Sequence, residues 1–220
     1  MTQKDLSATF DHTLLNPLAT QEAVRQLCLE AAEWRFATVC INPSYVLEAS
    51  QLLKGTAVGV CTVAGFPLGA ETTRTKQAQA RQAVEDGACE IDMVLNLGWV
   101  KDQRWAELEA EIHAVCVAAG VPVKVILETC YLTDAEIVKT CQLSESAGAF
   151  MVKTSTGWGK SGATPEHVQL MRSSVSPRVH VKASGGIRSL AACLAMLEAG
   201  ASRIGSSSSI AIMKEFADEP

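Results

Sequence analysis

Short apolar segments rich in valine and isoleucine recur along the 220-residue chain, with helical patterns between them. Several are continuous apolar runs, which is typical of strands covered by other elements on both faces. In the intervening segments apolar residues recur three or four positions apart, as in Leu108, Ile112 and Val115. The predicted strands span 8–12, 36–41, 57–63, 89–95, 121–128, 149–154, 178–183 and 202–205.

This alternation predicts an α/β fold with a parallel sheet, and its repeat number favours a single-domain (β/α)8 TIM barrel over residues 1–220. Glycines such as Gly120 and Gly148 stand where helices should end before the next strand. An open doubly wound sheet is the alternative. The chain has no G-x-G-x-x-G after the first predicted strand, which weakens the dinucleotide-binding version of that alternative.

Composition narrows the function classes. The formal net charge of -5 argues against general binding to nucleic acid or to an anionic membrane surface. We expect no signal peptide, because residues 1–5 are polar, and no membrane span, because no apolar run is long enough. The 8 cysteines form no C-x-x-C pair and mostly lie in apolar segments. They are expected to be reduced core thiols of a cytoplasmic protein.

Lys153 and Lys182 end successive predicted strands, and each leads into a glycine-bearing loop. Neighbouring strands lie about 4.8 Å apart, so both ammonium groups should be close together. Two close ammonium groups repel, and one of them tends to lose its proton and become a nucleophilic amine. The pair therefore indicates an enzyme that works through a Schiff base. The alternative is that both lysines simply reach solvent from the strand ends.

Other polar residues gather at the predicted carboxyl ends of strands, where barrels of this type carry their active sites. Asp92 is one of them. A carboxylate near a lysine pair can shuttle protons, or it can act solely as a salt-bridge partner. We expect Glu90 to face the surrounding helices instead. Interior positions without an acid–base role are expected for His12 and His180, and no histidine pair has the spacing of metal ligands.

Glycine and serine residues after the last two predicted strands suggest an anion site. Backbone amides in a glycine turn and at a helix N-terminus can cradle a phosphate, and the loops after strands seven and eight are its usual seat in this barrel. The alternative is that the glycines only permit tight turns. The predicted phosphate-binding residues are Thr156, Gly157, Gly185, Gly186, Arg188, Gly205, Ser207 and Ser208.

Several short motifs, in one order along most of the chain, resemble the class I deoxyribose-phosphate aldolases. They lie at 11–15, 39–43, 63–69, 90–94, 124–129, 152–157 and 182–188. The resemblance implies a barrel enzyme that reversibly joins acetaldehyde to D-glyceraldehyde 3-phosphate, giving 2-deoxy-D-ribose 5-phosphate. Its ligands would be a small phosphorylated sugar and an aldehyde.

The resemblance also implies roles for individual residues. Lys153 would form the Schiff base, Lys182 would favour its free amine, and Asp92 would take part in proton transfer. Asp11 would position a lysine or a substrate hydroxyl, and Cys40 would line the active site. No metal and no cofactor would be needed, because the iminium nitrogen serves as the electron sink.

The chain departs from the family pattern in two places. Trp158 stands where some members have a lysine, with Lys160 two residues on, and no tyrosine lies near the end of the chain, where some members have one. Two alternative functions remain at this point. One is another barrel lyase or isomerase for a sugar phosphate, and the other is a non-enzymatic phosphosugar-binding barrel. Apolar helix faces suggest a homodimer.

Overall fold

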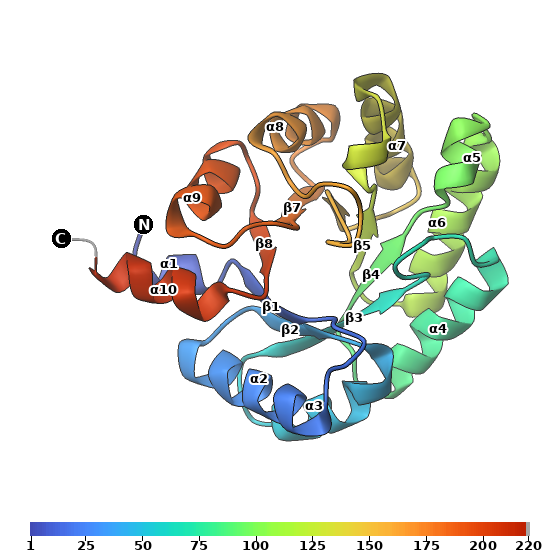
Figure 1. Cartoon of the computed structure of the whole chain (residues 1–220). Coiled ribbons are helices and arrows are strands. Elements are labelled where there is room, and N and C mark those ends of the chain that lie inside the picture. Colours follow the sequence, from blue (N-terminus) through green and yellow to red (C-terminus); the bar gives the residue numbers. More distant parts are fainter. Residues whose placement is uncertain (219–220) are drawn as a thin grey trace.

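Parallel strands pair in chain order and close into a barrel, in which β1 pairs with both β2 and β8 (Figure 1). The computed structural model describes residues 1–218. The strands are β1 (Phe10–Leu14), β2 (Thr38–Ile41), β3 (Gly59–Ala64), β4 (Glu90–Val94), β5 (Val123–Ile126), β6 (Met151–Lys153), β7 (His180–Ser184) and β8 (Arg203–Ser206). The predicted (β/α)8 barrel is therefore confirmed, and the open doubly wound sheet is excluded.

Helices connect the strands and surround the barrel (Figure 1). They are α1 (Gln3–Ser7), α2 (Gln21–Trp34), α3 (Val46–Leu52), α4 (Thr73–Glu85), α5 (Leu97–Lys101), α6 (Trp105–Ala119), α7 (Asp134–Ser146), α8 (Pro165–Ser174), α9 (Leu190–Glu198) and α10 (Ser209–Asp218). Short 3-10 turns, η1 (Pro43–Tyr45) and η2 (Thr129–Tyr131), follow β2 and β5. Within residues 1–218, no helix has both the length and the apolar character needed to cross a membrane.

Local sequence signals explain where several helices begin and end. Thr133 and Glu136 form a capping box at the start of α7, so each side chain satisfies a backbone N–H of the first turn. Gly120 ends α6 at a φ of 64°, in the left-handed region that glycine adopts without steric cost. These signals set the first turn of α7 and the last turn of α6.

The first strand is displaced from its predicted range of 8–12. Residues before it form α1, which has a capping box at Thr2 and Asp5 and ends at Ala8. The strand begins at Phe10 and runs through Asp11 to Leu14. Asp11 is consequently the second residue of β1, near the start of the strand rather than at its carboxyl end, and it is fully buried.

The main core lies between the barrel wall and the helices. It includes strand residues such as Ile91, Val125, Val152 and Val181, all at most 4% exposed. A separate apolar cluster contains Leu15, Cys40, Cys61 and Val63, with Phe66 packed against it. Because side chains alternate along a strand, the opposite face of the same strands is free to carry polar groups into the barrel.

Candidate active site

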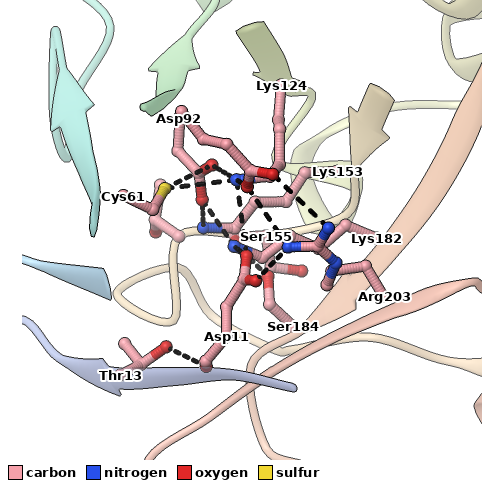
Figure 2. Close-up of polar contacts among 12 residues, drawn as sticks. Asp11, Thr13, Cys61, Asp92, Lys124, Lys153, Ser155, Lys182, Ser184 and Arg203 are labelled. Atoms are coloured by element: carbon pink, nitrogen blue, oxygen red, sulfur yellow. Dashed lines mark hydrogen bonds and ion pairs between the residues drawn. The ribbon is translucent and has the colours of Figure 1, made fainter. Parts of the chain in front are cut away.

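Asp92 on β4 joins three lysine side chains inside the barrel (Figure 2). Its Oδ2 lies 2.7 Å from the Nζ of Lys153 on β6 and 2.7 Å from the Nζ of Lys182 on β7. Its Oδ1 lies 2.8 Å from the Nζ of Lys124 on β5. Lys153 and Lys182 are direct partners in the β6–β7 register, so the predicted neighbouring lysines are found.

A second layer of charges connects this centre to β1 and β8. Asp11 binds the Lys182 ammonium through Oδ2 and the Arg203 guanidinium through Oδ1, the latter at 2.6 Å. Glu90 lies 2.6 Å from the Lys124 Nζ and 3.2 Å from Arg203. The cluster thus brings carboxylates from two strands together with cationic groups from four strands.

The expected orientation of Glu90 toward the helices is wrong. Glu90 and Asp92 are two residues apart on β4, and side chains two apart on a strand point to the same face. Glu90 therefore reaches into the barrel with Asp92, where it neutralises Lys124 and Arg203.

Burial and charge act in opposite directions on these groups. Burial would raise the pKa of Asp92, but the ammonium groups of Lys124, Lys153 and Lys182 overcome it, and the pKa lies well below its usual value. Asp11 shows the same balance, with a pKa that its cationic neighbours lower. Burial would lower the pKa values of Lys124 and Lys182, yet Asp11 and Asp92 raise both. Both carboxylates and both lysines are therefore held in their charged forms.

A cavity of about 160 Å³ opens at the carboxyl ends of the strands, and Lys153 lies in its wall. Lys153 is 3% exposed, whereas Lys124 and Lys182 are fully buried at 0%. The cavity is lined by Thr13, Leu15, Lys153, Thr156, Gly157, Ser184, Gly185, Gly186, Ile187, Arg188, Gly205, Ser206 and Ser207. Among the three lysines of the cluster, Lys153 is the one that a ligand in this cavity can touch.

Most residues of the predicted phosphate site line the same cavity, at the loops after β6, β7 and β8. Gly186 has a φ of 79°, and a Cβ built there would meet no protein atom within 4 Å. Ser208 is not a lining residue, and its N–H donates to the Ser206 hydroxyl. Thr156 lines the cavity, but its N–H and its hydroxyl both donate to Glu128.

Cys40 is fully buried beside Cys61 on β3 and is not a lining residue of the cavity. Both thiols and a carboxylate oxygen of Asp92 lie within 4.8 Å of one another. The Cys61 thiol donates to Asp92 at 3.2 Å, and the Lys124 ammonium also approaches this sulfur at 3.2 Å. The positive charge beside Cys61 and Asp92 therefore comes from the Lys124 ammonium group.

Comparison with known proteins shows the family to which the chain belongs. Residues 6–214 match the family model described as DeoC/LacD family aldolase. The chain belongs to the DeoC/LacD family of aldolases.

Relatives in this family match over nearly the whole chain. A deoxyribose-phosphate aldolase of Clostridium kluyveri is 52% identical over 217 residues, covering 98% of this chain and 100% of the relative. One from Carboxydothermus hydrogenoformans is 51% identical over 214 residues, covering 95% and 94%. The structure resembles that of a tetrameric deoxyribose phosphate aldolase from Aeropyrum pernix, with a TM-score of 0.92, 36% identity and coverage of 99% and 93%.

Membership of the DeoC/LacD family confirms the resemblance seen in the short motifs and makes the enzyme an aldolase. The two alternatives, a different barrel lyase or isomerase and a non-enzymatic sugar-binding barrel, are therefore set aside. The substrates of this aldolase are small molecules.

Several residues of this aldolase site were not predicted from sequence as site residues. Lys124 and Arg203 join the charge cluster, and Cys61 contacts Asp92. One signal for Lys124 was available, because it interrupts an apolar strand just as Lys153 and Lys182 do. Arg203 starts β8 and gave no comparable signal, since charged residues are common at strand starts.

The family departure at Trp158 has a clear location. Trp158 is 55% exposed and lines an apolar cavity of about 270 Å³, together with Leu15, Pro17, Asn42, Phe66 and Pro67. Leu15 also lines the cavity that holds Lys153. Lys160 points elsewhere, with its Nζ 5.6 Å from the centre of the Tyr131 ring. The other departure, the tyrosine-free chain end, includes residues 219 and 220, which lie outside the described residues.

The histidines lie apart from the charge cluster. The side chain of His12 leaves the barrel toward α2, where its Nε2 lies 3.0 Å from Glu30, and burial lowers its pKa. His180 packs against the Phe150 ring at a centroid distance of 5.2 Å. That neither histidine acts in acid–base chemistry stays a prediction.

Proposed function

We propose that this aldolase reversibly cleaves 2-deoxy-D-ribose 5-phosphate into acetaldehyde and D-glyceraldehyde 3-phosphate through a Schiff base on Lys153. The observation that carries the proposal is the position of Lys153: it belongs to the buried charge cluster and also lines the cavity. The substrate is supported by relatives of about 50% identity that are named deoxyribose-phosphate aldolases. That the reaction needs no metal and no cofactor stays a prediction.

The charge cluster holds more positive groups than negative ones. The carboxylates of Asp11, Glu90 and Asp92 face the ammonium groups of Lys124, Lys153 and Lys182 together with the Arg203 guanidinium. Positive charge is therefore in excess, and a buried excess of like charges favours the loss of one proton. Lys153 pairs with one carboxylate, Asp92, which it shares with Lys124 and Lys182.

The proposed cleavage starts with attack of the Lys153 Nζ on the aldehyde carbon of the open-chain sugar. Loss of water gives an iminium. The C3 hydroxyl then loses its proton, the C2–C3 bond breaks, and its electron pair forms the enamine while C3 becomes the aldehyde of glyceraldehyde 3-phosphate. Protonation of the enamine carbon and addition of water release acetaldehyde and restore the amine.

The proposed proton steps take place beside the Asp92–Lys182 pair. Asp92 alone is a weak base, because its pKa lies well below the usual value. Lys182 shares Asp92 Oδ2 with Lys153 at 2.7 Å, so it lies beside the reacting nitrogen. We assign the proton steps to water beside this pair, with Asp92 and Asp11 holding the Lys182 ammonium in place.

The phosphate is proposed to bind at the loops after β7 and β8. Gly185, Gly186, Ser207 and Arg188 line the cavity. The proposal assigns the phosphate contacts to the backbone amides of the first three and to the positive charge of Arg188. Thr156 differs from the sequence-based expectation, because both of its donors already bind Glu128. Gly157, Gly205 and Ser208 stay predicted members of this site, as do Asp11 and Cys40 for the sugar end.

Gly186→Val is expected to raise KM for deoxyribose 5-phosphate by about tenfold or more, because the new side chain would occupy the open space where the phosphate approaches the backbone. Turnover of unphosphorylated deoxyribose should change little. Valine at a φ of 79° also strains the backbone, so both substrates are compared in the same protein sample. Equal losses for the two substrates would show that the loop has a structural role instead.

The deciding test of the proposed function has two parts. Turnover of deoxyribose 5-phosphate is measured by the glyceraldehyde 3-phosphate formed, and the protein is reduced with borohydride in the presence of acetaldehyde. We expect turnover and an ethyl group on Lys153, located by peptide mass spectrometry. Turnover without a covalent adduct would overturn the Schiff-base mechanism. An adduct without turnover would overturn the assignment of deoxyribose 5-phosphate as the substrate. A homodimer and a cytoplasmic location stay predictions of the sequence.

A further inference from the structure

Glu128, just after β5, has an unusual backbone conformation for a residue with a side chain. Its φ and ψ are 53° and 59°, in the left-handed region. The residue is buried, with 2% of its surface exposed. Conformations of this kind persist where the surroundings hold them, and they gather at functional sites. The mechanism above makes no use of this carboxylate.

The carboxylate of Glu128 is enclosed by the loop that follows β6. The Thr156 N–H donates to both carboxylate oxygens, with N···O distances of 3.2 and 3.3 Å, and the Thr156 hydroxyl also donates to Glu128. The Trp158 N–H donates to the Thr156 hydroxyl oxygen at 3.0 Å. A Cβ at Gly159 would come within 3.1 Å of the carboxyl carbon of Glu128. We call residues 156–159 the β6 loop.

Residues on both sides of the β6 loop contact β7 and the residue that follows it. The Thr154 hydroxyl donates to the Ser184 carbonyl at 3.0 Å, and the Ser184 hydroxyl donates to the Ser155 carbonyl at 2.6 Å. Gly162 packs on Gly185 so closely that a Cβ at Gly162 would lie 2.0 Å from the Gly185 carbonyl oxygen. The segment is therefore held between both strands that flank β6, with Glu128 as its contact on the β5 side.

We infer that Glu128 is a positioning residue for substrate binding: its carboxylate holds the β6 loop as one wall of the catalytic cavity. Thr156 and Gly157 line that cavity, and Glu128 is not among its lining residues. Glu128 thus acts on the substrate through Thr156. This inference rests on the proposed function, because it assigns the wall to the binding of the sugar phosphate.

The test separates substrate binding from Schiff-base formation. Glu128→Gln keeps the shape of the side chain but places an amide NH2 where one oxygen accepts from Thr156. Losing a charged hydrogen bond of this kind should raise KM for deoxyribose 5-phosphate about tenfold or more. The rate of borohydride-trapped adduct formation with acetaldehyde should stay within about twofold, because acetaldehyde carries no group that reaches this wall.

The chain offers a matched control. Glu145 accepts from the N–H of Ser176 at 3.0 Å and from the hydroxyl of the same serine, so it repeats the chemistry of the Glu128–Thr156 contact. It lies at the end of α7, toward the opposite end of the barrel. Glu145→Gln should therefore leave KM unchanged. An equal rise in KM for both variants would overturn the positioning role.

Variants at Thr156 keep the inference testable if Glu128→Gln does not fold. Thr156→Val lacks the hydroxyl donor and should raise KM for deoxyribose 5-phosphate, whereas Thr156→Ser retains both donors and should raise it less. Where all proteins fold, the double variant Glu128→Gln/Thr156→Val should be no worse than the worse single variant. An unchanged KM in Glu128→Gln or in Thr156→Val would overturn the positioning role of Glu128 but would leave the proposed function standing. Absence of trapping at Lys153 in the wild-type enzyme overturns the proposed function, and this inference with it.

Discussion

Lys153→Ala is expected to abolish aldol cleavage, with a loss of at least about a thousandfold in kcat, while the protein stays folded. The amine of Lys153 lies in the cavity wall, and within the cluster the other lysines are fully buried and paired with two or more carboxylates each. Neither can therefore replace it as the nucleophile. The measurements are the rate of glyceraldehyde 3-phosphate formation and the borohydride-trapped adduct with acetaldehyde.

Lys54→Ala is a suitable control for this variant, because Lys54 is exposed and lies before β3, away from the cavity. It should keep both turnover and trapping. The fold of Lys153→Ala is checked by its thermal unfolding. If Lys153→Ala still turned over substrate and the adduct moved to a different lysine, the nucleophile would have been assigned to the wrong residue.

Asp92→Asn should lower kcat by about a hundredfold to ten-thousandfold, the usual range for the loss of a group that supports proton transfer. Asparagine has the shape of aspartate but cannot neutralise the ammonium groups of Lys124, Lys153 and Lys182. Removing one partner from buried ion pairs typically costs about 3–5 kcal/mol, so the unfolding temperature should fall as well. Kinetics, deuterium uptake by acetaldehyde and thermal unfolding are the measurements.

Deuterium uptake tests the assignment of the proton steps. The methyl group of acetaldehyde exchanges in D2O each time the enamine forms, so uptake in Asp92→Asn should slow more than adduct formation does. Asp102→Asn, at an exposed position after α5, serves as the control. If uptake and adduct formation slowed by the same factor, Asp92 would act on the nucleophile alone, without a part in proton transfer.

The pH dependence of this stability loss follows from the lowered pKa of Asp92. A carboxylate with a lowered pKa in the folded state stabilises the fold above its unfolded value of about 4, and that contribution is lost as the pH falls toward the folded value. The difference in unfolding free energy between wild type and Asp92→Asn should therefore be constant from about pH 5 upward and shrink below about pH 4. A difference that grew toward acid pH would contradict this assignment.

The sequence by itself determined the barrel and the pair of lysines. Apolar strand runs separated by helical patterns leave few stable arrangements other than a parallel sheet covered by helices. Lys153 and Lys182 lie on consecutive strands, and consecutive strands of a parallel barrel are neighbours, so their pairing follows from chain order. Asp92 was found because it is a charged residue in an apolar strand, and the glycine loops were found because their residues are next to each other in the chain.

The tertiary structure alone decided which other groups meet these residues. Asp11 meets Arg203 because β1 pairs with β8, the closure that joins the two ends of the chain. Lys124 reaches Glu90, Asp92 and Asp11 because the inward faces of β5, β4 and β1 share one interior at matching heights. The tertiary structure likewise decided the displaced start of β1 and the contact between Glu128 and the β6 loop. A sequence gives the period of side chains along each strand, but the height of one strand against a distant one depends on the closure of the whole barrel.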